Sequence, residues 1–357
     1  MINKNPKEFT ALNIQQWHNL GYTGKDINVG NTEKASINSP LFNGKIHDPY
    51  GDFSYQECSN LHGNHTAIMV HAVAPHADIY CLDMALSGIN DNFHGRLIDK
   101  TIPLIIEKNI SVITSSSWTS LLAEKTSLVK KIKSLPVLIS LAGNYGYSGV
   151  SGFAESGYWL AIGAVGFQYK SNEIFFHNYS ARDEKLSFAC FSGLSLPDFR
   201  PEPIYKDKFI TKNGTSFAAP MFAGMCALVQ DFFLTHTGKL LTHFQMDKFV
   251  KDHLIDLGDV GWDDKYGFGL FVLPDPRNII IDKYIDVAIV EVPEKEEIKM
   301  EFKDIGNHWA KQEIEFITEK GIMQGYPDET FQPDRALTRA EYATIKAKEL
   351  GFVKKKG

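Results

Sequence analysis

The stretch Ser216–Phe233 constrains the fold more than any other part of the chain, because it is the most apolar long segment. It follows Gly214 and is bounded by polar residues, which predicts a central buried helix. Short apolar runs alternate with helical patterns before it. We expect strands at Ile79–Leu82, Ser111–Thr114, Val137–Leu141 and Leu160–Val165, and helices at Leu97–Glu107 and Leu121–Ser134. This alternation predicts an α/β domain with a mostly parallel central sheet over residues 1–276.

The chain has 357 residues, which is enough for this domain and a smaller second one. Asn278–Val292 has a β-like pattern and is followed by the charged sequence PEKEEIK, so we interpret residues 277–298 as a linker. From Phe302 to Leu350 the pattern is two amphipathic helices around a turn rich in Gly and Pro. It predicts a small all-α domain over residues 299–357.

Composition and charge limit the classes of partner. The 37 basic residues against 43 acidic ones give a net charge of -6, and no basic stripe carries interleaved aromatic residues, so we expect no nucleic-acid partner. The sequence contains no run of about 18 uninterrupted apolar residues, so we expect no membrane span. The N-terminal residues lack the apolar core of a signal peptide. Four scattered cysteines, Cys58, Cys81, Cys190 and Cys226, are expected to be free thiols.

Ser216 begins the apolar helix, directly after Gly214-Thr215 in the sequence NGTSFAAPMFAGMCALV. The N-terminus of a helix favours developing negative charge, which suits a nucleophilic hydroxyl. Such a triplet is also an ordinary helix cap. The longer pattern G-T-S-x-A-x-P, followed by A-G, resembles the nucleophile segment of the subtilisin-like serine proteases (peptidase family S8). That resemblance implies a three-layer subtilisin-like fold and makes Ser216 the nucleophile.

Two further segments resemble blocks of the same family. Residues 60–80 contain H-G-x-H-x-A followed by V-A-P-x-A, which implies that His62 is the general base and His65 a structural histidine. Two such histidines could also be a zinc pair, but the zinc motif H-E-x-x-H is absent. Residues 137–149 resemble the block A-G-N-x-G, whose asparagine amide donates to the oxyanion; here it is Asn144. By itself this asparagine would be a turn residue.

The family places its triad acid upstream, at the end of a strand. GYTGKDINVGNTEKAS, residues 21–36, matches the opening of that block, and counting along the strand puts the acid at Glu33. Asp26 comes too early, at the beginning of the strand. Strand alternation puts four residues on one face: Ile27, Val29, Asn31 and Glu33.

This block departs from the family pattern, because glutamate replaces aspartate and Lys34-Ala35 replaces the usual T-G. Other serine hydrolases use Glu in this role. The resemblance therefore predicts a serine endopeptidase with a Ser-His-Glu triad, acting on a peptide or protein substrate. The alternative is an inactive relative that kept Ser216 and His62 and binds a cell wall or a partner.

The expected substrate cleft also departs from the family. VITSSSWTS, residues 112–120, resembles the strand that pairs with the peptide substrate and ends in S-x-G, but Trp118 occupies the glycine position. We expect Ser116, Ser117, Trp118 and Gly143 to contact substrate. Trp118 either narrows the cleft or packs beneath a loop. The resemblance implies no required cofactor; calcium sites are frequent in the family, but no ligand loop is identified here.

Residues 302–352 resemble an S-layer homology (SLH) domain over nearly their whole length. The resemblance implies binding to anionic secondary cell-wall polysaccharide through Thr338, Arg339 and Glu341. Thr338 and Glu341 also form a capping box pattern, whereas the Arg339 guanidinium suits bidentate contact with an anion. The single copy could instead dock onto another protein. The SLH resemblance favours a cell-surface or extracellular location, while the N-terminus favours a cytoplasmic one.

Overall fold

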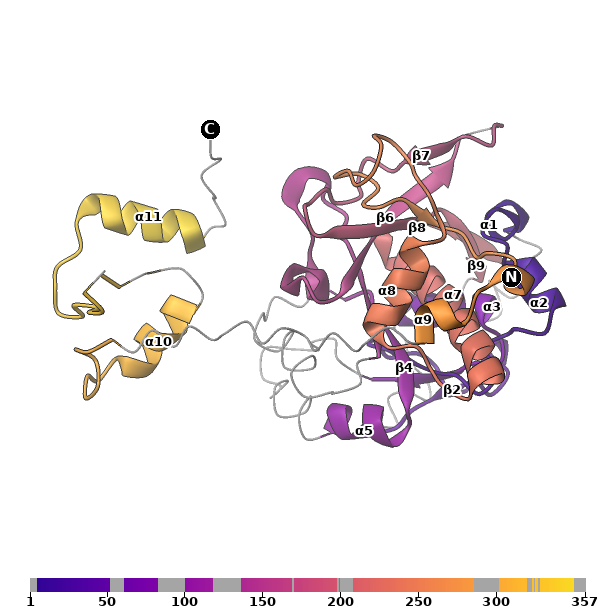
Figure 1. Cartoon of the computed structure of the whole chain (residues 1–357), viewed down its shortest axis with the longest axis horizontal. Coiled ribbons are helices and arrows are strands. Elements are labelled where there is room, and N and C mark those ends of the chain that lie inside the picture. Colours follow the sequence, from indigo (N-terminus) through magenta and orange to yellow (C-terminus); the bar gives the residue numbers. More distant parts are fainter. Residues whose placement is uncertain are drawn as a thin grey trace. The chain divides into compact units, whose positions relative to one another are not determined.

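The chain divides into two compact units, Met1–Ala288 and Ile289–Gly357. Figure 1 shows the structure, a computed structural model of the whole chain. It describes residues 5–51, 61–82, 100–117, 136–168, 170–197, 199, 208–285, 302–319, 323, 325–326 and 328–349. The predicted segments 97–99, Trp118 and Leu121–Ser134 lie outside the described residues.

The first unit is built on a 10-stranded sheet with the order β11-β12-β8-β6-β5-β4-β1-β3-β2, and β7 pairs with β6. Its strands are β1 (Asn28–Asn31), β2 (Ile46–His47), β3 (Asp78–Cys81), β4 (Ile110–Ser115), β5 (Val137–Leu141), β6 (Leu160–Phe167), β7 (Ile174–Phe176), β8 (Leu186–Phe191), β11 (Leu254–Ile255) and β12 (Leu270–Phe271). Neighbours from β12 to β2 run parallel, and among the described strands of this sheet only β7 and β11 pair antiparallel. A separate antiparallel pair is formed by β9 (Leu194–Pro197) and β10 (Phe209–Lys212). The predicted mostly parallel sheet is confirmed.

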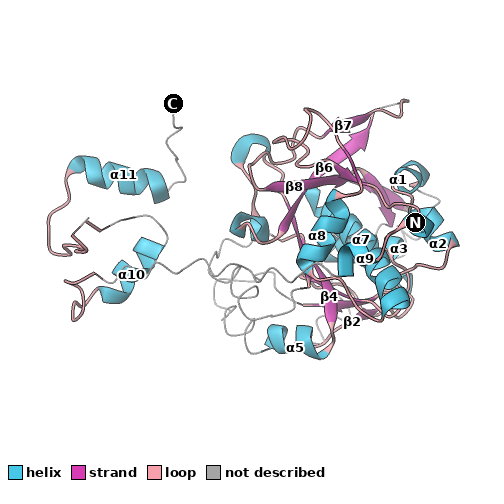
Figure 2. Cartoon of the chain, in the orientation of Figure 1, coloured by secondary structure: helices cyan, strands magenta, loops and turns pink. Residues whose placement is uncertain are grey.

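Helix α7 (Thr215–Thr237) is the central element of this unit (Figure 2). Its residues are buried from Thr215 to Phe233, and it packs against β4, β5, β6 and β8 and against α3 (Leu61–Val73). Among the described residues it is the one helix long and apolar enough to cross a membrane, but 94% of its most apolar window is buried inside the fold. It is therefore a core helix, as its composition predicts.

Shorter helices surround this core. They are α1 (Pro6–Ala11), α2 (Ile14–Asn19), α5 (Ile102–Glu107), α8 (His243–Lys251) and α9 (Asp282–Ile285), with 3-10 turns η2 (Pro40–Phe42), η5 (Gly146–Ser148), η6 (Gly152–Ser156) and η7 (Pro276–Asn278). Helix α5 packs against β4, and α8 against β5 and α9. The predicted strands and the central helix are confirmed, with β5 at the predicted bounds.

The predicted β-like run from Asn278 is wrong for the residues that the structure describes. Residues 276–285 form η7 and α9 instead. Tyr284 of α9 is buried, with its ring centroid 6.0 Å from that of Phe233 and 5.0 Å from that of Phe249. Tyrosine favours strands when only the local sequence is considered. Here the Tyr284 side chain packs a short helix, α9, against the core. Residues 277–285, interpreted above as linker, therefore belong to the first unit.

The described cysteines are free thiols, as expected. Cys81, Cys190 and Cys226 are buried and unbridged, and Cys58 lies outside the described residues. Burial raises the pKa of Cys190 to about 12 and raises the pKa of Cys226 as well. Both thiols therefore stay protonated and act as small apolar side chains of the core.

The second unit has a small core of its own. It contains α10 (Lys311–Glu319) and α11 (Arg339–Glu349), the two helices expected from the pattern. Among the described residues of this unit, Phe302, Ile305 and Ile314 are buried together, with Ala310 and Phe331 packed against them. The Asp304 carboxylate accepts hydrogen bonds from the backbone N–H groups of Phe331 and Gln332 at 2.9 and 2.7 Å, and the first of these bonds is the main cause of its lowered pKa.

The carboxylate of Asp231, on α7, holds the turn that precedes β1. One of its oxygens accepts hydrogen bonds from the backbone N–H groups of Thr23, Gly24 and Lys25, at 2.9, 2.9 and 3.0 Å. Asp231 is buried, so water cannot replace it as the acceptor. This contact ties the beginning of β1 to the core helix, and β1 leads directly to Glu33.

We expect Asp231→Ala to lower the free energy of unfolding by about 2–4 kcal/mol, because it leaves the buried N–H of Gly24 and the partly buried N–H groups of Thr23 and Lys25 without their acceptor. Asp247→Ala is the matched control. Asp247 forms a partly exposed pair with Lys251 on α8, at 2.8 Å, and a pair of this kind contributes only about 0.5 kcal/mol. Urea unfolding of the three proteins measures the difference. Equal losses in both variants would contradict the anchoring role of Asp231.

Candidate active site

The predicted site residues lie where several parallel strands end. β1 leads to Glu33, β4 to Ser116 and Ser117, and β5 to Gly143 and Asn144. The carboxyl ends of parallel strands meet at one edge of a sheet, which is where α/β folds place their sites. The first turns of α3 and α7, which carry His62 and Ser216, are tied to this edge by the contacts described next.

Glu33 and His62 form a hydrogen-bonded pair. Nδ1 of His62 lies 2.8 Å from Oε1 and 3.0 Å from Oε2 of Glu33. The Glu33 side chain is only 8% exposed, whereas that of His62 is 41% exposed. A carboxylate is an acceptor, so Nδ1 carries the proton and Nε2 is left as the acceptor. Asp26, by contrast, is exposed in the turn before β1, at the other end of the strand.

Ser216 occupies the first turn of α7 and is buried apart from 5% of its surface. The Ser116 hydroxyl donates to the Ser216 carbonyl oxygen at 2.9 Å. The ring of Phe217, the next residue, lies with its centroid 5.6 Å from that of His62. The structure therefore brings the beginning of α7 beside the His62 imidazole.

The residue before this helix, Gly214, has a φ of 135°, a conformation that a side chain would strain. Its N–H donates to Ser192 Oγ at 2.9 Å and to the Tyr179 hydroxyl at 3.2 Å, while Ser192 Oγ donates to the Gly214 carbonyl at 3.0 Å. The Tyr179 hydroxyl donates to Ser192 Oγ at 3.1 Å. Burial is the main cause that raises the pKa of Tyr179. This network sets the direction in which α7 starts, and so the place of Ser216.

Asn144 is oriented by Thr215. Its Oδ1 accepts from the Thr215 N–H at 2.8 Å and from the Thr215 hydroxyl at 3.0 Å. A backbone N–H can only donate, so the amide oxygen faces Thr215 and the Nδ2 group is the donor on the other side. Gly143, with a φ of 119°, donates its own N–H to Thr215 Oγ1 at 3.1 Å. Thr215 thus connects the end of β5 to the beginning of α7.

The expected substrate residues have different surroundings. The Ser116 side chain is buried, and its hydroxyl bonds to the nucleophile segment; the substrate contact expected of Ser116 stays a prediction. Ser117 is half-buried, with its hydroxyl 3.3 Å from that of Ser115. Trp118 lies outside the described residues, and its two interpretations stay open.

His65 has a structural environment. It is buried, its Nε2 lies 3.0 Å from the Pro197 carbonyl oxygen, and its ring packs on that of Phe199. In the part of the chain that the structure describes, no group of three or more His, Cys, Asp or Glu side chains could hold a metal ion. The structural role implied for His65 by the family resemblance agrees with these contacts.

Two polar residues that the sequence did not mark as functional also surround Glu33. Asn31 and Thr66 are both fully buried. Asn31 Nδ2 donates to the Glu33 carbonyl oxygen at 3.0 Å, and Thr66 Oγ1 lies 3.3 Å from Glu33 Oε2. A signal existed in the spacing, because Asn31 and Glu33 are two residues apart, on one face of the predicted strand, and Thr66 lies one helical turn after His62.

In the second unit, Thr338 and Glu341 form the predicted capping box. The Thr338 N–H donates to Glu341 Oε2 at 2.7 Å, and the Glu341 N–H to Thr338 Oγ1 at 3.2 Å. The bond from the Thr338 backbone is the largest cause that lowers the pKa of Glu341 to about 2, and Arg335 pairs with the same carboxylate. These two side chains therefore cap the N-terminus of α11. Arg339 is exposed, and within the described chain its guanidinium has no ion pair.

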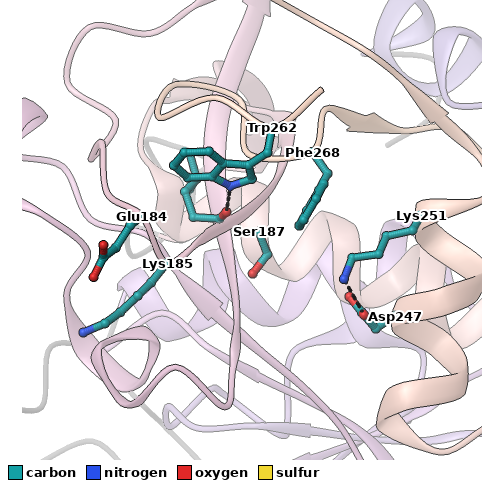
Figure 3. A pocket seen from close by; sticks show the side chains of 8 residues that line it. Glu184, Lys185, Ser187, Asp247, Lys251, Trp262 and Phe268 are labelled. Atoms are coloured by element: carbon teal, nitrogen blue, oxygen red, sulfur yellow. Dashed lines mark hydrogen bonds and ion pairs between the residues drawn. The ribbon is translucent and has the colours of Figure 1, made fainter. Parts of the chain in front are cut away.

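Figure 3 shows a pocket of the first unit. Glu184, Lys185, Ser187, Trp262 and Phe268 line it, near the amino end of β8. Several of its polar groups already have partners: Trp262 Nε1 donates to the Leu186 carbonyl at 2.9 Å, and Lys251 pairs with Asp247. The triad lies at the carboxyl ends of the strands, so this hollow belongs to the opposite edge and we assign it no chemistry.

Comparison with known proteins matches both units. A family model described as "Subtilase family" matches residues 37–269, and one described as "S-layer homology domain" matches residues 301–343. The first match begins after Glu33. Subtilisin E from Bacillus subtilis (strain 168) is 30% identical over 245 residues, which are 63% of this chain and 60% of that protein. The chain thus spans less than two thirds of this relative.

The C-terminal unit and the fold have relatives of their own. A cellulosome-anchoring protein from Acetivibrio thermocellus (strain ATCC 27405) is 50% identical over 50 residues, which are 14% of this chain and 11% of that protein. The crystal structure of a lanthipeptide protease superposes with a TM-score of 0.60 at 18% identity, covering 76% of this chain and 93% of that one. The second likeness shows the fold alone.

Proposed function

Because this chain belongs to the subtilase family, with a subtilisin-like α/β fold and a C-terminal S-layer homology domain, we propose that it is a serine endopeptidase. Ser216 is the nucleophile, His62 the general base, Glu33 the orienting acid and Asn144 an oxyanion donor. The observation that carries the proposal is the pair between His62 Nδ1 and Glu33 Oε1, at 2.8 Å beside the first turn of α7.

The reaction follows from these contacts. Glu33 holds the Nδ1 proton of His62, so Nε2 can accept the proton of the Ser216 hydroxyl as Oγ attacks the carbonyl carbon of a peptide. The imidazolium that forms is stabilised by the buried carboxylate. It then donates its proton to the leaving amine, and a water activated by His62 hydrolyses the acyl-enzyme.

The developing oxyanion needs donors that are already in place. The Asn144 Nδ2 group is the donor of this side chain, because Thr215 donates to its Oδ1. The backbone N–H of Ser216 is the second candidate, since the first N–H groups of a helix have no partner within the helix. Loss of one such donor typically slows acyl transfer about 10²–10³-fold. Donors fixed before the reaction cost no reorganisation during it.

The test of the enzyme proposal is covalent labelling with a fluorophosphonate. We expect the folded protein to be labelled at Ser216, as located by peptide mass spectrometry, and Ser216→Ala to remain unlabelled. Ser111→Ala is a control, since Ser111 is also buried, near the beginning of β4, and its Oγ has no hydrogen-bond partner among the described residues; it should still be labelled at Ser216. Absence of labelling on the folded wild-type chain would instead favour an inactive binding protein.

A second prediction identifies the acid. Glu33→Gln should slow labelling by about 10³–10⁴-fold, because an amide cannot stabilise the imidazolium and presents the wrong group to Nδ1. Asp26→Asn should change the rate less than about twofold, because surface substitutions away from the site have small effects. Pseudo-first-order labelling rates measure both. A large loss in Asp26→Asn with little change in Glu33→Gln would mean that Asp26 is the acid.

We also propose that the C-terminal domain binds anionic secondary cell-wall polysaccharide. The likeness to a cellulosome-anchoring protein supports this, and the exposed Arg339 guanidinium supplies a cation suited to bidentate contact with an anion. Thr338 and Glu341 would act indirectly, since their capping box fixes the first turn of α11, where Arg339 lies. Docking onto another protein is the alternative.

Sedimentation with purified bacterial cell walls tests this role. We expect the full chain to pellet with the walls and a chain lacking residues 299–357 to stay in the supernatant. Arg339→Gln should weaken binding about tenfold or more, as loss of a charge-assisted hydrogen bond does. Lys311→Gln on the exposed face of α10 is the control and should bind normally. Equal sedimentation with and without residues 299–357 would discard the proposal.

A further inference from the structure

We propose that Asn31 and Thr66 are positioning residues that adapt this site to a glutamate. The inference rests on the proposed function, because it gives both residues a role in the reaction of Ser216. Each is fully buried and makes a polar contact with Glu33. Their effect on the reaction would pass through Glu33 to His62.

Thr66 acts on the carboxylate. It lies on α3 one turn after His62, so both side chains face the end of β1. Its Oγ1 is 3.0 Å from the Gly63 carbonyl, 3.3 Å from Glu33 Oε2 and 3.4 Å from Asn31 Oδ1. A hydroxyl has one proton, so these acceptors share it. Glu33 is the only charged acceptor of the three, and hydrogen bonds to an ionised group are the stronger ones.

Asn31 acts on the backbone of the same residue. It is the last residue of β1, and its Nδ2 donates to the Glu33 carbonyl oxygen at 3.0 Å. Its Oδ1 faces the Thr66 hydroxyl. One amide therefore connects the backbone of Glu33 to the group that contacts the Glu33 carboxylate. Asn31 thus contacts the backbone carbonyl of Glu33, and Thr66 contacts its carboxylate.

A glutamate needs this support more than an aspartate would. Its extra methylene adds a rotatable bond, and immobilising a buried Glu side chain costs up to about 2 kcal/mol of entropy. Here both oxygens lie within 3.0 Å of His62 Nδ1. A rotation of the carboxylate would break that arrangement without moving the backbone. Apolar residues in place of Asn31 and Thr66 would leave this rotation free.

The test compares Thr66→Val, which removes the hydroxyl, with Thr66→Ser, which keeps it. Fluorophosphonate labelling is followed over a range of probe concentrations, which separates the maximal rate of inactivation, kinact, from the affinity for the probe, KI. We expect Thr66→Val to lower kinact about tenfold with KI unchanged, as loss of a hydrogen bond to a charged group does. Thr66→Ser should stay within about twofold of the wild type. Asn31→Leu should lower kinact in the same way.

Thr114→Val is the matched control for a lost buried hydroxyl. Thr114 is fully buried on β4, opposite Asn31 in the β1–β4 register, and its Oγ1 has no hydrogen-bond partner in the described part of the chain. We expect its kinact to be unchanged. Thermal unfolding of every variant shows whether it is folded, and if Thr66→Val does not fold, Asn31→Leu decides the comparison.

The two proposals fail in different ways. No labelling of folded wild-type protein would overturn the enzyme and the positioning role together. Labelling of the wild type with an unchanged kinact in Thr66→Val and Asn31→Leu would overturn the positioning role alone. Equal losses in Thr66→Val and Thr66→Ser would also overturn it, because the hydroxyl would then not be the cause. In a Glu33→Gln background, Thr66→Val should add less than about twofold, since effects that act through one group are not additive.

Discussion

The burial of α7 between the sheet and α3 is the constraint on which the rest of the first unit depends. A helix that is apolar over most of its length must be covered by other elements, and here β4, β5, β6, β8 and α3 cover it. That packing brings the first turns of α3 and α7 to the edge where β1, β4 and β5 end. The elements that carry Glu33, His62, Asn144 and Ser216 therefore meet because of the core, before any contact between the four side chains is considered.

Polar contacts then fix the arrangement to the accuracy that chemistry needs. Each connects two segments that are distant in sequence: Asp231 to the turn before β1, Ser116 to the carbonyl of Ser216, and Thr215 to Asn144. The groups involved are buried or half-buried, so each lost bond would leave an unpaired donor or acceptor. Such a site is held rigid before substrate arrives, which is the condition for stabilising a transition state electrostatically.

Much of this could be predicted from the sequence, because the informative patterns are local. The β5 strand Val137–Leu141 and the buried helix starting near Ser216 depend on runs of apolar residues. Glu33 could be found by counting along a strand of regular period from the turn before it. The β-like run from Asn278 failed for the opposite reason: an aromatic residue, Tyr284, packs onto Phe233 and Phe249, and this tertiary contact selects a helix.

The sequence by itself determined the fold class, the core helix, the family and the residue types of the candidate triad, since periodicity and motif spacing encode them. Only the tertiary structure decided what surrounds those residues. It gave the Ser116 hydroxyl a buried hydrogen bond to the carbonyl of Ser216, and it placed Asn31 and Thr66 against Glu33. The physical reason is that a hydrogen bond between residues distant in the chain depends on the distances and angles that packing sets. The sequence pattern of a single strand or helix does not specify which element packs against it.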